Sequence, residues 1–439
     1  MFRIVDPEIG FTSDVIRDPN RFVGRTELIK DCIAALNSTQ SLIAIYGKRG
    51  VGKSSLLRQV QQMAAGNYSI VGNSGLAHLV PEKIRRYYTV YYSCDSIIDG
   101  AEDLVSRLCN DTDPEDGLLR LVPDRGKELV EFSRGSETGG GFDLKVLNWG
   151  RKEQAADKYA SSVPNDIIQT FRNFTSSVVS ANNRTFSRRE SVLILLDEFD
   201  VIKDKGGLGS LIKSLSSPTV KFGICGIGSD ISALVADHKS VARLVEQGAV
   251  HVKPMSSSEI IQIFRRAEEL FKGVVNFDDD VIMAIASYSE GYPYLSQLMG
   301  KACVTIANEH GTNTISREIL TLMLDKIRTG QAFPSLEQAY QMAIGNSEDR
   351  ALLLTLLAEQ SKDTTEYDAS AGLVALKQSR STAQELGVEY IDQLLPRLIE
   401  EKYGPVLVKV PDGRGLYEFS DPVFRTYVKL RAVGHRPAA

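Results

Sequence analysis

Short apolar runs alternate with longer, helically periodic stretches in the first half of this 439-residue chain. Residues 42–46, 87–93, 192–196 and 220–226 show almost no polar alternation, which is typical of strands buried on both faces of a parallel sheet. Between them lie stretches such as residues 101–109, in which apolar positions recur every three or four residues. Strands that alternate with helices in this way predict an α/β fold with a parallel sheet.

This core is expected to occupy residues 21–250, after an N-terminal arm over residues 1–20. Residues 127–151 contain two β-like runs around the glycine-rich stretch 135–141, which predicts a hairpin inserted into the core. Whether this hairpin is a lid, an oligomer contact or a functional finger is open.

Beyond the core the pattern becomes helical. Ser256 and Glu259 have the spacing of a capping box at the start of a helix. Further helices are expected at residues 279–288, 294–307 and 335–344. Together they predict an α-helical lid over residues 251–345.

The C-terminal part, residues 346–431, has the element order of a winged helix-turn-helix. Three helices, a hairpin with a P-D-G turn and a last helix are expected at residues 349–360, 382–387, 388–403, 406–419 and 422–431. The hairpin would form the wing of a C-terminal winged-helix domain, and residues 432–439 would form a tail.

A glycine-rich loop follows the first predicted strand. Gly47 to Ser54 read G-x-x-x-x-G-K-S, a Walker A motif, between an apolar run and a helical pattern. Glycines allow the backbone to curl so that its N–H groups point at phosphate oxygens, and the helix N-terminus adds partial positive charge. Lys53 would reach the β and γ phosphates, and the Ser54 hydroxyl would complete the Mg²⁺ shell. The expected nucleotide-binding residues of this segment are Gly47, Gly50, Val51, Gly52, Lys53, Ser54 and Ser55.

A second acidic site follows the predicted strand at residues 192–196, which ends in D-E-F-D. Acids at the carboxyl end of a buried parallel strand lie where α/β proteins bind ligands. Asp197 is placed to hold Mg²⁺, directly or through water, and Glu198 to orient or deprotonate the attacking water. Because a base beside the metal ligand serves hydrolysis rather than mere binding, the pair favours an ATPase with ATP and Mg²⁺ as its cofactors.

Composition narrows the remaining possibilities. The net charge of −5 and pI of about 5.7 give no overall nucleic-acid footprint. The five cysteines have no C-x-x-C spacing, so reduced thiols are expected rather than disulfides or zinc. No apolar run approaches the length of a membrane span, and the first residues lack the apolar region of a signal peptide. A cytoplasmic location without membrane contact is therefore expected.

The order of these features resembles the AAA+/STAND branch of P-loop ATPases, in particular the archaeal-ATPase and origin-recognition-like lineage. Along the chain they are F-V-G-R, Walker A, the D-E strand, a sensor-like strand, the helical lid and the winged helix. The resemblance spans about residues 20–430. It implies that the F-V-G-R segment lines the adenine pocket, through Phe22, Val23, Gly24 and Arg25. It also implies a γ-phosphate sensor at Ser229 or Asp230, although a simple turn and helix cap there is the alternative.

The lid departs from the AAA+ pattern. AAA+ lids carry an arginine that touches the nucleotide, whereas the matching stretch here is G-Y-P-Y-L-S-Q-L, which is closer to the G-x-P pattern of STAND switches. Gly291 and Pro293 are therefore candidates for residues through which the lid responds differently to ADP and to ATP. The alternative is that they simply begin a helix. Arg243 stands where the family sometimes has a trans arginine finger, and Arg265 and Arg266 are alternatives or solvated lid residues.

Two classes of function remain. The first is an ATP-driven switch in which ATP or ADP controls assembly with itself or a partner effector protein. The second is a DNA-binding ATPase of the origin-recognition, loader or transposition-regulator type. Acids on the predicted recognition helix oppose DNA contact, but basic residues gather nearby, at Lys377, Arg380, Arg414, Arg425, Lys429 and Arg431. The switch is favoured; a housekeeping ATPase subunit directed by a partner is a third possibility.

Overall fold

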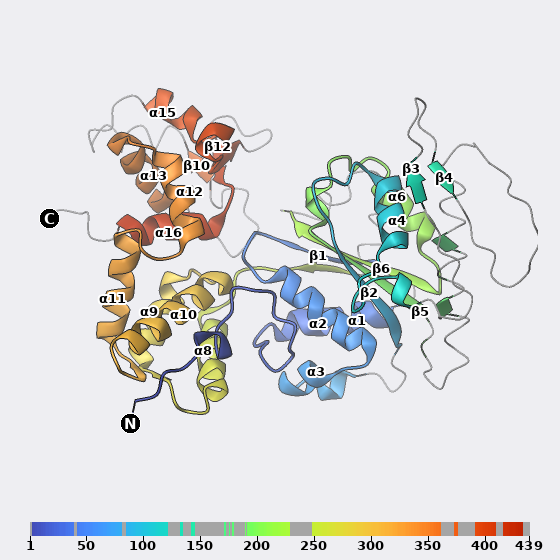
Figure 1. Ribbon diagram of the computed structural model, residues 1–439, viewed down its shortest axis with the longest axis horizontal. Coiled ribbons are helices and arrows are strands. Elements are labelled where there is room, and N and C mark those ends of the chain that lie inside the picture. Colours follow the sequence, from blue (N-terminus) through green and yellow to red (C-terminus); the bar gives the residue numbers. More distant parts are fainter. Residues whose placement is uncertain are drawn as a thin grey trace, which may run out of the picture. The chain divides into compact units, whose positions relative to one another are not determined.

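The computed structural model describes residues 2–38, 42–80, 85–121, 132–134, 142–144, 171–172, 175, 178–179, 189, 191–228, 248–360, 373–375, 391–409 and 416–432 (Figure 1). The chain divides into two compact units. Ile16–Gly47 and Lys53–Val252 form one, named here the core unit. Met1–Val15, Lys48–Gly52 and Lys253–Ala439 form the other, named here the helical unit.

A five-stranded parallel sheet in the order β2-β5-β6-β1-β7 forms the centre of the core unit. Its strands are β1 (Ile43–Gly47), β2 (Tyr87–Ser93), β5 (Ser191–Asp197), β6 (Val220–Ile227) and β7 (Ala249–His251). The four predicted strands are confirmed to within one residue at each end. The prediction lacked β7, because three residues are too short to show a strand period.

Helices cover both faces of this sheet (Figure 1). On one face, alternate strand residues such as Val90, Ile194 and Phe222 pack with buried side chains of α4 (Ala101–Asn110) and α6 (Leu208–Leu215). The opposite face packs against two helices, α1 (Thr26–Asn37), which precedes the phosphate loop in the sequence, and α2 (Lys53–Ala65), which follows it. The other described elements of the core unit are α3 (Ser69–Asn73), η2 (Ala77–Leu79), η3 (Leu119–Leu121), β3 (Phe132–Arg134), β4 (Phe142–Leu144) and η4 (Phe199–Val201).

The predicted inserted hairpin has antiparallel strands in the structure, since β3 pairs with β4 and Phe132 lies opposite Leu144. The rest of the 127–151 segment is outside the described residues.

In the helical unit, the N-terminal arm packs against α10 (Pro293–Glu309) and its neighbours. The Asn308 side chain binds the arm backbone with two hydrogen bonds: it donates to the Val5 carbonyl (2.7 Å) and accepts from the Val5 N–H (3.1 Å). Phe11 is fully buried, with ring centroids 5.3 Å from Phe264 and 5.7 Å from Phe277. Residues 1–15 of the arm, which contain η1 (Pro7–Ile9), are therefore an integral part of this unit.

The lid helices begin at the predicted capping box, in which Ser256 and Glu259 each bond the other's backbone. A helix that the sequence analysis lacked, α11 (Arg317–Arg328), follows α10. The described lid elements are α8 (Ser257–Leu270), β8 (Asn276–Phe277), α9 (Asp279–Tyr288), α10, β9 (Thr314–Ile315), α11 and α12 (Pro334–Ile344).

The C-terminal part contains a three-stranded sheet in the order β10-β12-β11. Its described elements are α13 (Glu348–Gln360), β10 (Leu373–Ala375), α15 (Ile391–Arg397), η6 (Glu401–Tyr403), β11 (Leu407–Lys409), β12 (Leu416–Phe419) and α16 (Pro422–Ala432). The helix predicted over residues 388–403 is wrong at its C-terminal end, because Pro396 disrupts the helical bonding and α15 ends at Arg397. The predicted helix at residues 382–387 lies outside the described residues, so the winged helix stays a prediction, as do the domain boundaries.

The five cysteines are free and buried. Burial raises the thiol pKa of each of them, and it raises the pKa of Cys94, Cys109 and Cys303 to about 12. Among the described residues, no helix is long and apolar enough to cross a membrane.

Candidate nucleotide-binding site

The predicted phosphate loop runs from the last residue of β1, Gly47, to the first turn of α2, which begins at Lys53. Gly47, Gly50 and Gly52 have φ values of 154°, 76° and 93°. These conformations are costly for residues with a Cβ, so the loop needs glycine at these positions. Val51 between them is buried, with 1% of its surface exposed. This backbone is the strand–loop–helix geometry that cradles phosphates.

The tip of the loop packs within the helical unit. A Cβ added to Gly50 would lie 2.5 Å from Val423 Cγ2, and one added to Gly52 would lie 3.7 Å from Pro293 Cγ. Two charged residues of the tip also form ion pairs there, Lys48 with Glu418 (3.4 Å) and Arg49 with Asp421 (3.9 Å). The loop tip is therefore in contact with α10, β12 and the start of α16.

Three side chains at the start of α2 differ in their surroundings. The Lys53 side chain is buried, with 9% of the residue exposed, and Ser54 is half-buried. The Ser55 hydroxyl accepts a hydrogen bond from the Ile16 N–H (3.0 Å). Ser55 thus ties the chain before α1 to the phosphate-loop helix, and this contact was not predicted.

The acidic strand ends at the same edge of the sheet as the phosphate loop. β6 lies between β1 and β5, and pairs Ile227 with Gly47 on one side and Ile224 with Leu196 on the other. Asp197 closes β5 and is only 4% exposed. Its carboxylate accepts hydrogen bonds from the Tyr91 hydroxyl (2.5 Å) and the Glu198 N–H (2.9 Å).

The next two acids have different roles. Glu198 has φ 53°, a conformation that is uncommon for a residue with a Cβ and is often found at functional sites. Its side chain is exposed and accepts a bond from the Ser93 hydroxyl (3.2 Å). Asp200 instead accepts from the Ile227 N–H (2.8 Å) and so holds the end of β6. Of the three acids, Glu198 is the most exposed.

The F-V-G-R segment immediately precedes α1. Phe22 and Arg25 are 9% and 8% exposed, and Gly24 and Arg25 have φ values of 68° and 61°. Two successive left-handed residues turn the chain into the helix, and this turn accounts for the glycine. Val23 is half-buried beside them. Contact with adenine by these residues remains a prediction.

The predicted sensor and finger residues, Ser229, Asp230 and Arg243, lie outside the described residues. Pro293 is the first residue of α10, and Gly291 has φ 80° with the Met255 carbonyl oxygen 2.4 Å from where a Cβ would be. A residue other than glycine would be strained at position 291. The guanidinium groups of Arg265 and Arg266 pair with Glu268 and Asp279 and with Glu269 on the surface.

Residues 11–66 match the family model described as Novel STAND NTPase 1. This segment holds the F-V-G-R residues, β1, the phosphate loop and all of α2, so the resemblance to STAND NTPases is confirmed for this part of the chain. The predicted fold class, an α/β P-loop NTPase core on a parallel sheet, is confirmed by the β1–loop–α2 arrangement and the five parallel strands. No curated protein matches the chain.

Several solved structures are similar to this chain. The Walker-type ATPase PABY2304 of Pyrococcus abyssi is 14% identical with a TM-score of 0.48, over 95% of this chain and 99% of that one. Cdc6p from Pyrobaculum aerophilum is 11% identical with a TM-score of 0.43, over 98% and 99%. The Aeropyrum pernix ORC2 protein is 13% identical with a TM-score of 0.43, over 93% of each chain.

A partly buried ion pair joins the turn before α10 to the C-terminal helix. The Glu290 carboxylate pairs with Arg425, whose side chain is 2% exposed, and accepts from Lys429 Nζ (2.7 Å) and Thr426 Oγ1 (2.9 Å). Burial alone would raise the pKa of Glu290, but the positive charges of Arg425 and Lys429 outweigh it and the pKa lies below its usual value. The pair holds α16 beside Gly291 and Pro293.

We expect Glu290→Gln to lower the free energy of unfolding of the helical unit by about 1.5–3 kcal/mol, because the buried Arg425 guanidinium loses its charge-assisted hydrogen bond to Glu290. The pKa of Glu290 is lower in the folded chain than in the unfolded chain. The pair therefore contributes its full stabilisation above the usual glutamate pKa of about 4.3, and this stabilisation is lost as the pH falls below that value. Urea unfolding at pH 7 and about pH 3 should show the difference between the two chains shrinking in acid. Glu309→Gln, in the exposed pair with Lys326 (2.9 Å), is the control and should cost about 1 kcal/mol or less; equal losses in both variants would contradict the prediction.

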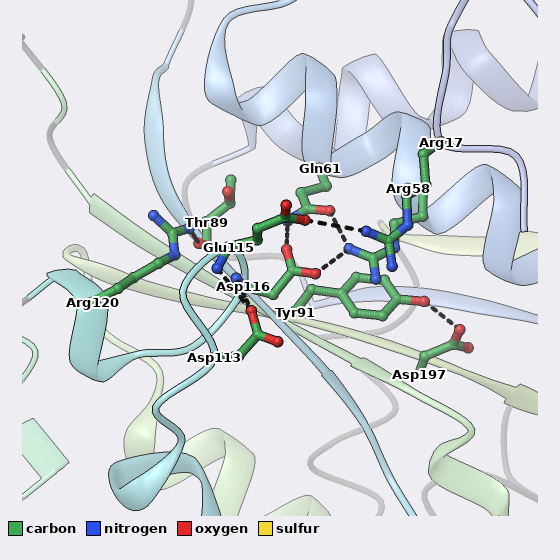
Figure 2. Close-up of polar contacts among 10 residues, drawn as sticks. All are labelled: Arg17, Arg58, Gln61, Thr89, Tyr91, Asp113, Glu115, Asp116, Arg120 and Asp197. Carbon is green, nitrogen blue, oxygen red and sulfur yellow. Dashed lines mark hydrogen bonds and ion pairs between the residues drawn. The ribbon is translucent and has the colours of Figure 1, made fainter.

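The sequence analysis missed the side chains that surround Asp197. Tyr91, Arg58 and Asp116 form a connected polar group behind the acid (Figure 2). The aromatic-rich strand Y-Y-T-V-Y-Y was the available signal, but only the pairing of β2 with β5 shows which tyrosine reaches the acid.

Proposed function

We propose that this chain is a Mg²⁺-dependent ATPase whose nucleotide state controls its conformation and its assembly with itself or with a partner effector protein. The observation that carries the proposal is the glycine-built phosphate loop at the same sheet edge as Asp197 and Glu198. Such a pairing serves hydrolysis of a nucleoside triphosphate in P-loop enzymes.

The side chains present fit a magnesium nucleotide. Mg²⁺ prefers hard oxygen ligands, which the Ser54 hydroxyl and the Asp197 carboxylate supply. Bound Mg²⁺ would neutralise charge on the phosphates. The backbone N–H groups of residues 50–54 and the Lys53 ammonium would bind the phosphate oxygens, and Glu198 would take a proton from the attacking water. Sensor and finger roles for Ser229 and Arg243 are proposed on the sequence alone, as are adenine contacts by Phe22, Val23, Gly24 and Arg25.

The switch is supported by the contacts of the loop tip within the helical unit. Gly52 lies against Pro293 at the start of α10, and Gly50 lies against Val423 on α16. The γ-phosphate would bind beside these residues, so ATP and ADP would differ in how they constrain the loop tip. A difference in binding between the two conformations is what a nucleotide-driven shift requires. Pro293 and Gly291 are proposed as the residues that report this difference.

The test combines hydrolysis with assembly. The purified chain should release phosphate from ATP only with Mg²⁺, and light scattering should show a different mass with a non-hydrolysable ATP analogue than with ADP. Absence of hydrolysis would remove the ATPase assignment. Hydrolysis with the same mass and the same protease sensitivity in both nucleotide states would remove the switch.

Charge pairing disfavours the DNA-binding alternative. Of the basic residues that could contact a phosphate backbone, Arg425 and Lys429 pair with Glu290, and Arg431 pairs with Glu337 (3.1 Å). Residues Lys377, Arg380 and Arg414 are outside the described residues. Duplex binding measured against salt concentration decides the matter: a steep slope with nanomolar affinity would favour DNA, and weak or no binding would favour the switch.

A further inference from the structure

The side chain of Tyr91 crosses from one strand to the end of the next. In the register of β2 with β5, Tyr91 lies opposite Leu195, and Ser93 lies opposite Asp197. The Tyr91 hydroxyl nevertheless donates to Asp197 Oδ2 at 2.5 Å, because the long side chain leans toward the carboxyl edge of the sheet (Figure 2). A shorter side chain at this position would not reach the acid.

Arg58 of the phosphate-loop helix holds the Tyr91 ring in place. Its guanidinium carbon lies 3.3 Å from the ring centroid, an arrangement that combines stacking with cation–π attraction. Arg58 Nη1 donates to Asp116 Oδ2 (2.7 Å) and to Gln61 Oε1 (2.9 Å). The Arg58 side chain is 9% exposed and that of Asp116 15%, so solvent screens this pair little.

Asp116 contacts both Tyr91 and side chains of α2. Its second carboxylate oxygen accepts from Gln61 Nε2 (2.7 Å), and its carbonyl oxygen accepts from the Tyr91 N–H (3.1 Å). One loop residue therefore fixes both the backbone of Tyr91 and the guanidinium that packs on its ring. Tyr91 is thus bound through its backbone, its ring and its hydroxyl at once.

These contacts fix the orientation of the Asp197 carboxylate. With Oδ2 bonded to Tyr91 and Oδ1 bonded to the Glu198 N–H, the carboxylate plane is held in one rotamer before any ligand arrives. Mg²⁺ demands near-octahedral geometry, so a carboxylate that is already oriented binds it with less loss of freedom. Partners that orient a metal ligand typically contribute about 10–100-fold in metal affinity.

We propose that Tyr91 is a positioning residue for Mg²⁺, which orients Asp197 and is itself held by Arg58 and Asp116. The inference rests on the proposed function, since it takes Asp197 as a metal ligand. It adds that contacts from α2 and from the loop around Asp116 set the metal requirement of the site. Ser54 is the only expected metal ligand in these two segments.

The test compares tyrosines of one strand. Tyr91→Phe removes only the hydroxyl, and the Mg²⁺ concentration that gives half of the full nucleotide affinity should rise about 10-fold, while affinity in EDTA stays unchanged. Tyr87→Phe is the matched control, because it also removes one buried tyrosine hydroxyl of β2, which donates to the Leu36 carbonyl (2.8 Å). Affinity is read with a fluorescent ATP analogue, and metal binding separately by electron paramagnetic resonance of Mn²⁺.

An unchanged metal requirement in Tyr91→Phe, or an equal shift in Tyr87→Phe, would overturn the inference. If the unmodified chain bound the analogue equally well with and without Mg²⁺, the proposed metal site would fail first, and this result is distinct from the other two.

A double-mutant cycle tests whether Arg58 acts through Tyr91. Arg58→Met should raise the Mg²⁺ requirement in the unmodified chain and add little in the Tyr91→Phe background, because residues that act through one contact are not additive. Thermal unfolding of each variant monitors folding. Additive shifts would show that Arg58 acts by another route and would overturn that part of the inference.

Discussion

Lys53→Ala is expected to abolish triphosphate binding at micromolar nucleotide, with affinity lower by about 100-fold or more. The ammonium would contact charged phosphate oxygens, and hydrogen bonds to charged groups contribute about 1.5–3 kcal/mol each. Neighbouring cations do not replace it, since Lys48 and Arg49 pair with Glu418 and Asp421.

Lys48→Ala is the matched control, because it removes the same charge five positions earlier in the same loop. Its ion pair with Glu418 is partly exposed and contributes about 1 kcal/mol or less, so nucleotide affinity should stay close to that of the unmodified chain. Titration with a fluorescent ATP analogue measures both variants. A Lys53→Ala chain with unchanged affinity, or one no weaker than Lys48→Ala, would remove Lys53 from the site.

Glu198→Gln is expected to bind ATP with nearly native affinity and to hydrolyse it about 10²–10⁴-fold more slowly, because an amide cannot accept the proton of the attacking water. The exposed Glu198 side chain and its bond with Ser93 should tolerate the change, so folding is expected to persist. The variant should also accumulate the ATP-bound assembly, which makes it suitable for capturing a partner protein.

Single-turnover hydrolysis separates binding from chemistry in this variant. Glu115→Gln, the same change at an exposed carboxylate of the core unit, is the control and should hydrolyse ATP at the native rate. A native rate in Glu198→Gln would show that another group is the base.

The sequence predicted the elements that bear the site because each has a strong local signal. β5 is an unbroken apolar run that is buried along its whole length, and the Walker A motif fixes the turn between β1 and α2. α11 was predictable too, since its buried residues Ile319, Met323 and Ile327 recur every four positions. Weak signals explain the other errors: β7 is too short to show a period, and the helical pattern around α15 continues past Pro396.

Contacts between distant segments were not predictable in the same way. The bond from Tyr91 to Asp197 depends on which strands pair and in what register, and the sequence separates the two residues by 106 positions. The pair of Glu290 with Arg425 likewise depends on how α16 packs. Patterns along the chain thus predict the phosphate loop and the acids, whereas only the packed structure reveals what orients them.

Equilibrium dialysis of the chain against labelled ATP, with and without Mg²⁺, tests the central claim most directly. Stable retention of one ATP per chain at micromolar concentration with Mg²⁺, and its loss in Lys53→Ala, is the predicted result. No retained ATP at millimolar concentration, or retention that is the same in Lys53→Ala, would contradict a nucleotide site built on this loop.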